Sequence, residues 1–300
     1  MSGKHKIQVT TSRNINRWTH FIDGNRVSLL DSSPDTLEVD FCAIEFIRPP
    51  QVASLACLIE EYYACGAKVV FKKNTSKPSK YLDKINFFQY WEPGFNRKEY
   101  HRANINTHLC LWQLDRNMIS PYVDYSQKYY QNNYFAGQDL QGLNTSMAEV
   151  FNNIVDHAHS AVSGYSVTQY YPNRNEIVLS VCDFGNGIPY TVNAFLEKEG
   201  KKLLSDFDAI RRAFKKGFST RSTPTNRGFG LNTISSLVKT LNGRLIIVSN
   251  QTIFEQQIGG DFVEHYSDKC FPGTLIAIYL DTRFLEPISD EELVENEFML

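Results

Sequence analysis

The N-terminal third of the chain alternates between strand-like and helix-like spacing of its apolar residues. Residues 37 to 47 have the apolar, extended pattern that predicts a strand. After the proline pair at 49–50, apolar positions recur on one helical face as far as Gly66, which should end that helix. Residues 67 to 71 then predict a short strand, and residues 81 to 88 a short helix. This alternation predicts a small α/β domain.

A second series of predicted elements begins near residue 140. The spacing predicts a helix from about residue 140 through 159, a strand at 176–182 and, after a long connection, a helix at 230–241. Two further strands are predicted at 244–249 and 274–280. The second half of the chain therefore also has the pattern of an α/β domain.

The stretch between these two series gives a weaker pattern. Residues 108 to 114 have the composition of a strand, whereas the aromatic-rich residues 122 to 135 show no clean period. We place a domain boundary there. This predicts an α/β domain over residues 1–125, a second domain over 126–285 and an acidic tail over 286–300.

The overall composition is that of a folded protein with balanced charges. Hydrophobic residues make up 42% of the 300 positions, which allows a sizeable core, and the formal net charge is −2. This balance gives no overall attraction to nucleic acid or to an anionic membrane, so neither is expected as a partner. No apolar run approaches the roughly 18 residues of a membrane span. The six cysteines form no C-x-x-C pair, and we expect them to be reduced, in a cytoplasmic protein.

Two polar residues of the predicted helix at 140–159 are candidates for chemistry. Glu149 and Asn153 are four residues apart, so a helix places them on the same face. A carboxylate can accept a proton from water, and an amide oxygen is a suitable ligand for Mg²⁺. The alternative is a solvated helix face with a capping amide, and these two residues alone do not decide between the interpretations.

Asp183 follows the predicted strand at 176–182, at the end of the strand where ligand sites in α/β sheets tend to lie. Its carboxylate could accept a hydrogen bond from an exocyclic amine such as that of adenine. Gly185 and Gly187 would permit positive φ angles and the close approach of a flat ring. A tight Asp-Gly turn without a ligand is the alternative.

The predicted helix at 230–241 begins with a second glycine motif, Arg227-Gly-Phe-Gly230. Free N–H groups and the helix dipole at such a start favour a phosphate group. The glycines could instead serve only to pack the start of the helix.

Nearly forty residues separate the two glycine motifs, and cations and hydroxyls gather near the end of this connection. That composition suits a lid over a triphosphate, with candidate groups at Lys215, Lys216, Ser219, Thr220, Arg221 and Arg227. A partly helical insertion at residues 207–214, with exposed charges, is an equal alternative. Thr274 begins the last predicted strand and could reinforce Asp183 through a water, although turn chemistry also accounts for it.

Taken together, these motifs resemble the GHKL superfamily of ATP-binding domains over residues 130 to 285. The segment E-V-F-N-N-I-V-D-H-A at 149–158 is similar to the asparagine box of that family, most of all in the anti-sigma-factor kinase branch. D-F-G-N-G-I-P at 183–189 and R-G-F-G-L at 227–231 resemble its two glycine boxes, and G-T at 273–274 its closing threonine. The resemblance implies an α/β sandwich of the Bergerat type, with a mixed sheet and helices on one face.

The resemblance also implies roles for individual residues. Asn153 would bind Mg²⁺, Glu149 would be the general base and Asp183 would read adenine. The Glu-to-Asn spacing of four favours Asn153 over Asn152 as the metal ligand. The remaining nucleotide contacts would come from the two glycine boxes, the lid and the closing threonine: Gly185, Gly187, Ile188, Lys216, Ser219, Thr220, Arg227, Gly228, Phe229, Gly230, Leu231 and Thr274.

The N-terminal part, from about residue 25 to 120, more loosely resembles a STAS-like domain of the anti-sigma-factor antagonist type. Where a phosphorylated member would have serine before the helix, this chain has Arg48-Pro-Pro-Gln51, which favours packing or partner binding over phosphorylation.

Three functions remain open on the sequence. The chain could be a slow ATPase that acts as a nucleotide-gated switch, a serine kinase acting on a protein partner, or a module that holds ATP without turnover. Glu149 weighs against the third. A histidine kinase is disfavoured because no helical hairpin with a suitable histidine precedes the motifs, and a DNA clamp because only about fifteen residues follow the last strand. We expect ATP and Mg²⁺ as cofactors, and a protein partner or a homodimer formed through the N-terminal domain.

Overall fold

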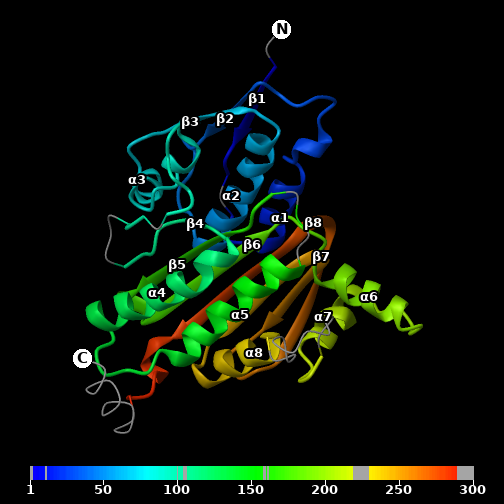
Figure 1. Cartoon of the computed structure of the whole chain (residues 1–300). Coiled ribbons are helices and arrows are strands. Elements are labelled where there is room, and N and C mark those ends of the chain that lie inside the picture. Colours follow the sequence, from blue (N-terminus) through cyan, green and yellow to red (C-terminus); the bar gives the residue numbers. More distant parts are fainter. Residues whose placement is uncertain are drawn as a thin grey trace.

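The computed structural model describes residues 3–10, 12–99, 101–103, 107–157, 160, 162–218 and 230–288. Within these ranges the chain forms two separate β-sheets with helices around them (Figure 1). The α/β class predicted from the sequence is confirmed. No helix among the described residues is both long enough and apolar enough to cross a membrane.

The smaller sheet is parallel and lies at the N-terminal end of the molecule (Figure 1). Its order is β1-β2-β3, and each strand is followed by a helix. Helix α2 starts at two prolines, which suit a first helical turn, and Gly66 has a φ of 88° just after it ends. The elements are β1 (Lys4–Gln8), α1 (Ile15–Asp23), β2 (Thr36–Asp40), α2 (Pro49–Ala64), β3 (Lys68–Lys72) and α3 (Lys77–Lys84).

The larger sheet has five strands in the order β4-β5-β6-β8-β7. All described strand pairs in this sheet are antiparallel. The sequence predicted one mixed sheet, but the parallel pairs lie in the smaller sheet and the antiparallel pairs in the larger one. The strands are β4 (Trp112–Gln113), β5 (Tyr165–Tyr171), β6 (Glu176–Asp183), β7 (Arg244–Gln256) and β8 (Phe262–Asp281). The helices of this part are α4 (Ile119–Asn133), α5 (Gln141–His157), α6 (Ile188–Lys198), α7 (Asp206–Ala213) and α8 (Gly230–Thr240).

Alternate residues of the larger sheet face two different cores. On β6, the side chains of Ile177, Leu179 and Val181 pack with helices α4, α5 and α8. Cys182, on the other face of the same strand, belongs to the core that contains α1 and α2. Because side chains alternate along a strand, one sheet carries both layers. The expectation of helices on one face therefore holds only for those of the C-terminal part, since the N-terminal helices cover the opposite face.

A buried carboxylate joins α2 to the larger sheet. Glu60, on α2, accepts hydrogen bonds from Tyr165 on β5 at 2.7 Å and from the Trp91 indole at 3.0 Å. It also pairs with Arg97 at 3.0 Å. A charge at this depth is tolerated because its oxygens are paired and hydrogen-bonded. The N-terminal segment is thus connected to the sheet by polar bonds as well as by apolar packing.

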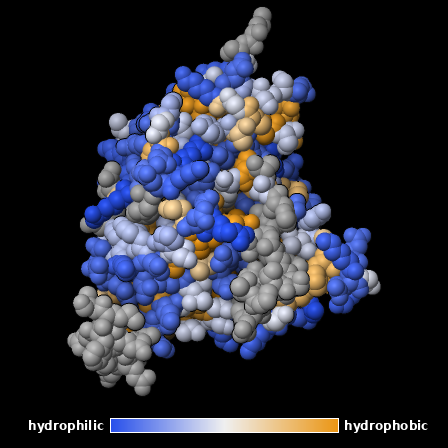
Figure 2. All heavy atoms as spheres, in the orientation of Figure 1, coloured by the Kyte–Doolittle hydropathy of each residue, from blue (hydrophilic) through white to orange (hydrophobic). Residues whose placement is uncertain are grey.

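The exposed faces of the helices are polar, as their sequences require. Figure 2, in the orientation of Figure 1, shows mainly hydrophilic side chains over α4 and α5. The apolar faces of the same helices contribute Tyr122, Tyr130, Met147 and Phe151 to the core beneath them. This is the amphipathic arrangement expected of helices that cover one face of a sheet.

Several sequence-based predictions differ from the structure. The strand expected at 37–47 ends at Asp40, and the helix expected at 81–88 begins earlier, at Lys77, after a capping Ser76. Residues 122–135 lie largely in α4, although their aromatic side chains gave no clean period. Of residues 108–114, only Trp112–Gln113 form a named strand. The elements β1, α1 and β5 were not predicted.

Candidate functional site

Three polar side chains lie side by side where the apolar part of the larger sheet ends. Asp183 on β6 is in register with Thr274 on β8, and Thr274 is in register with Ser249 on β7. All three are at most 5% exposed. Along each strand, the residue two positions away packs against α5 and α8, and side chains two positions apart point to the same face. This polar row therefore lies on the face of the sheet that α5 and α8 cover.

Hydrogen bonds hold the loop after Asp183 against this row. The Asp183 carboxylate accepts a bond of 2.8 Å from the N–H of Gly185. The Ser249 hydroxyl accepts a hydrogen bond of 3.1 Å from the N–H of Ile188. It donates a hydrogen bond of 2.8 Å to the carbonyl oxygen of Gly273. Ser249 was not among the sequence-predicted residues. The sequence feature that could have identified Ser249 is its hydroxyl directly after the apolar residues 245–248.

Two glycines permit the close approach of backbone to backbone at this point. Gly273 has a φ of 76°, and a methyl group there would lie 2.4 Å from the Asp183 carbonyl oxygen and 2.7 Å from its carboxylate. Gly187 has a φ of 79°, and a methyl group there would lie 2.7 Å from the Ser249 hydroxyl. Both positions combine a left-handed backbone with a lack of space, so only glycine fits without distortion.

The carboxyl group of Asp183 has a strongly altered pKa. Burial, which removes water from the charged form, raises the pKa of Asp183 to about 7. The backbone N–H groups of Gly185 and Thr274 act in the opposite direction. A buried carboxyl with a pKa near neutrality is a common feature of functional sites.

Helix α5 brings the candidate base and metal ligand toward the same end of the sheet. A methyl group on Gly164 would lie 2.9 Å from both the Ile154 side chain and the Cys182 carbonyl oxygen. Ile154 therefore packs beside the residue that precedes Asp183, and Asn153 is its neighbour on α5. Glu149 lies one turn earlier on the same helix and is half-buried, which raises the pKa of its carboxyl group.

The glycine motif at 227–230 is described only at its last residue. Gly230 is the first residue of α8, which packs beside α5, and the side chain of Leu231 is buried in the core facing α5. In Figure 1 the C-terminal end of α5 and the starts of α6 and α8 lie toward the same side of the molecule. Six predicted residues fall outside the described ranges: Ser219, Thr220, Arg221, Arg227, Gly228 and Phe229.

The long connection between the glycine motifs is partly helical. Helix α6 starts at Ile188, and α7 covers residues 206–213, which confirms the helix predicted near 207–214. Lys216 lies in the turn that follows α7. Beside α7 is a cavity of about 680 Å³, whose walls include Lys201, Arg211, Arg212, Lys215, Phe214 and Phe262.

No family model matches the sequence, and no curated protein matches it. Among solved structures, the chain is similar to a topoisomerase IV ATP-binding domain of Francisella tularensis, solved in complex with a small-molecule inhibitor. The sequence identity is 16% and the TM-score is 0.30; the match covers 64% of this chain and 48% of that chain. The match thus spans about half the length of that solved chain.

The described residues hold no group of three or more His, Cys, Asp or Glu side chains that could bind a metal ion. Asn153 and Glu149 carry side-chain oxygens, and hard oxygen donors suit Mg²⁺, which commonly takes its other ligands from water and phosphate.

Proposed function

We propose that the end of the larger sheet between α5, α6 and α8 binds an adenine nucleotide with Mg²⁺. The observation that carries this proposal is the polar row of Asp183, Thr274 and Ser249, buried beside two glycines that leave room only for backbone. On this face the row ends the apolar runs of β6, β7 and β8, and a buried acidic group requires a partner that can donate hydrogen bonds.

Adenine would add a further donor to a carboxylate that already has two backbone donors. The N–H groups of Gly185 and Thr274 both act on the Asp183 carboxyl group, and its two oxygens have further acceptor capacity. In our proposal, the exocyclic amine of adenine donates to it, and Thr274 and Ser249 hold the carboxylate and the loop in place. Guanine presents a carbonyl oxygen at the corresponding position and would be rejected, because two acceptors would then face each other.

The phosphates and the metal are assigned to the helical side of this site. The start of α8, with Gly228 and Gly230, would receive the phosphates, supported by Gly185, Gly187 and Ile188 of the first glycine motif. Lys216, Ser219, Thr220 and Arg227, with Phe229 and Leu231, would complete the phosphate side. Asn153 would hold Mg²⁺, whose charge polarises the phosphates when it is bound.

Glu149 is assigned as the general base for slow hydrolysis. Burial raises the pKa of its carboxyl group, which makes the carboxylate a stronger base. The phosphate acceptor would be water in an ATPase. In the alternative function, a serine kinase, it would be a hydroxyl of a protein partner that approaches the same carboxylate.

Binding and turnover are tested separately. Calorimetric titration with ATP, ADP and GTP should show binding of both adenine nucleotides and weak or no binding of GTP. Asp183→Asn should abolish binding, because an amide oriented to accept from Gly185 turns its NH₂ group toward the amine of adenine. Equal affinity for GTP and ATP would contradict the assignment of Asp183.

Turnover is followed with labelled phosphate in a Glu149→Ala protein, which should bind ATP but not release phosphate. Label that appears on a protein partner rather than in solution would favour the kinase. Undiminished phosphate release by Glu149→Ala would contradict its assignment as the base. We also propose that the N-terminal segment transmits the nucleotide state to a partner or to a second copy, which a change of mass on adding ATP would reveal.

A further inference from the structure

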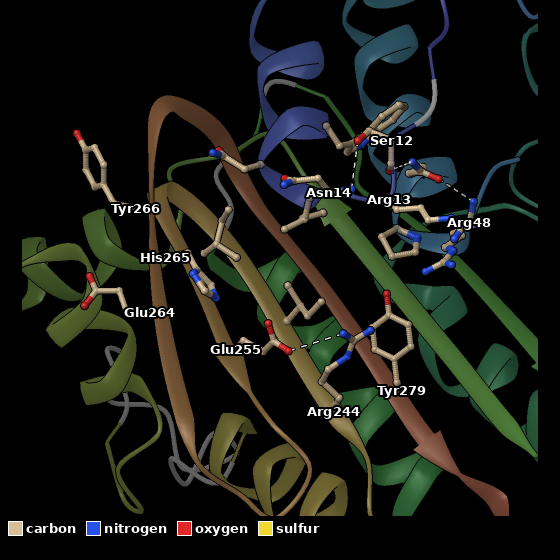
Figure 3. Close-up of a pocket in the computed structure, with 17 residues that line it drawn as sticks. Ser12, Arg13, Asn14, Arg48, Arg244, Glu255, Glu264, His265, Tyr266 and Tyr279 are labelled. Atoms are coloured by element: carbon tan, nitrogen blue, oxygen red, sulfur yellow. Dashed lines mark hydrogen bonds and ion pairs between the residues drawn. The ribbon is translucent and has the colours of Figure 1, made fainter. Parts of the chain in front are cut away.

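A second cavity, of about 660 Å³, lies on the other face of the larger sheet. Its floor is formed by β7 and β8, through Arg244, Glu255 and Tyr279, and its walls by the starts of α1 and α2 (Figure 3). Ile246 and Ile253, which also line it, belong to the core of α1 and α2 rather than to that of α5. The cavity is therefore separated from Asp183 by the thickness of the sheet.

Three arginines from separate segments converge on this cavity. The guanidinium carbons of Arg13 and Arg48 lie 5.6 and 5.9 Å from the centre of the same Phe46 ring. Arg244 lies 4.4 Å from the centre of the Tyr279 ring. Contact with a ring face leaves the N–H donors at the guanidinium edge available, and those donors match the oxygens of phosphate or carboxylate.

The two carboxylates that line the cavity lie on the side of β7 and β8, away from Arg13 and Arg48. Glu255 lies 3.7 Å from Arg244, and Glu264 lines the side formed by the β7–β8 hairpin (Figure 3). Within the described part of the chain, no carboxylate lies within ion-pair distance of Arg13 or Arg48, although the charge of Arg48 acts on the Glu176 carboxyl group from further away. These two cations, placed near one ring, repel each other and would be stabilised by an anion between them.

A buried amide fixes the two segments that carry these arginines. Gln51 is only 4% exposed. Its side chain accepts a hydrogen bond of 2.9 Å from the N–H of Arg48 and donates one of 2.9 Å to the carbonyl oxygen of Ser12, the residue before Arg13. The first two residues of α2 are prolines and have no N–H, so this helix start contributes its dipole but few donors. The donors for an anion would be the guanidinium groups themselves, which extend from backbone segments that Gln51 holds together.

We propose that this cavity binds a small molecule through a phosphate or carboxylate group placed between Arg13 and Arg48. Its volume falls within the range of pockets that hold small ligands. The remainder of the ligand extends toward Arg244, Glu255 and His265, which can pair with hydroxyl or other polar groups. This site is independent of the nucleotide site proposed above, because it involves different residues on the opposite face of the sheet.

The test is calorimetric titration of the full chain with inorganic phosphate, glycerol 3-phosphate and citrate, each at millimolar concentration and low salt. Binding of the phosphate probes alone assigns a phosphate group, and binding of citrate alone assigns a carboxylate. Arg48→Ala and Arg13→Ala should each weaken binding by about tenfold or more, because each removes a charge-assisted pair of hydrogen bonds.

Two controls make the result specific. Arg174→Ala removes an exposed arginine that contacts the Tyr171 ring outside the cavity, and it should change affinity by less than about twofold. Asp183→Asn should bind the probes as the unaltered chain does.

The proposal is overturned if no probe binds, if Arg174→Ala weakens probe binding as much as Arg48→Ala, or if Asp183→Asn abolishes probe binding. Arg13 is exposed, so Arg13→Ala should keep the fold and leave the test valid even if Arg48→Ala unfolds.

Discussion

The guanidinium carbon of Arg26 lies 4.9 Å from the centre of the Phe184 ring. Arg26 follows α1 in the chain and is held by Glu61 of α2, to which its Nε donates at 2.8 and 2.7 Å. Phe184 is the residue directly after Asp183, and its ring also contacts Phe271 on β8. The Arg26–Phe184 pair is thus one of the contacts by which the N-terminal segment reaches the loop of the proposed adenine site.

Arg26→Ala is expected to weaken ATP binding by about two- to thirtyfold, the range that corresponds to the loss of one cation–π contact. The loop at Phe184 would lose a fixed neighbour, and the Asp183 carboxylate would be less well ordered. Calorimetric titration measures the effect, with Arg17→Ala, an exposed arginine of α1, as the matched control. Equal affinity in the two variants would show that this contact does not support the site.

The pH dependence of nucleotide binding should follow the ionisation of Asp183. Its pKa is raised to about 7 by burial, and only the ionised group can accept hydrogen bonds at both oxygens without donating one. ATP affinity should therefore decrease as the pH falls below about 7, by up to tenfold per unit. Titrations from pH 8 to pH 6 test this, and an affinity that does not change over that range would argue against an ionised Asp183 in the complex.

The same raised pKa predicts an effect on stability without ligand. The folded protein binds the Asp183 proton more tightly than the unfolded chain, whose pKa is near 4. This contribution is fully present at low pH and is lost as the pH rises through about 7. Compared with Asp183→Asn, the unaltered chain should lose up to about 4 kcal/mol of unfolding free energy between pH 4 and 8. Parallel pH profiles of urea unfolding for the two proteins would contradict the expectation.

Gly273→Ala should be strongly destabilising. The added methyl group would overlap the backbone of Asp183 and Gly185, and the backbone would have to keep a φ of 76°. We expect a loss of about 3 kcal/mol or more in unfolding free energy, from strain and steric overlap together. Gly200→Ala is the control, because Gly200 has a φ of 65° but nothing within 4 Å of the new methyl group. If both variants lose the same unfolding free energy, the backbone around Gly273 has moved to relieve the overlap, and the expectation is wrong.

Glu60→Gln should destabilise the association of α2 with the larger sheet. It would leave Arg97 without its charged partner and weaken the bonds from Tyr165 and Trp91. The expected loss is about 3 kcal/mol, the lower end of the cost of breaking a buried ion pair. Urea unfolding gives this value, and Glu197→Gln on the exposed side of α6 should change it by less than about 0.5 kcal/mol.

Elements with a strong local signal were predicted well from the sequence. Strand β6 and helix α8 agree to within one residue with the bounds that their apolar spacing predicts. Helix α8 ends shortly before Asn242-Gly243, where the N–H of Gly243 donates to the carbonyl of Val238. Residues 165–171 were missed because Ser166, Thr168 and Gln169 are polar yet at most 9% exposed. Their burial is caused by segments that are distant in the sequence, which no local pattern records.

The amino-acid sequence by itself determined the positions of the turns, the apolar faces of the helices and the strand end that carries Asp183, because these depend on spacing and backbone preferences over a few residues. Only the tertiary structure placed Ser249 beside Thr274, Arg26 on Phe184, and Arg13 with Arg48 around Phe46. Except for Arg48 and Phe46, which are two residues apart, these contacts join residues that are far apart in the chain or lie on different elements. Their proximity follows from strand order, from register and from the packing of α1 and α2 on the sheet, which are properties of the whole fold.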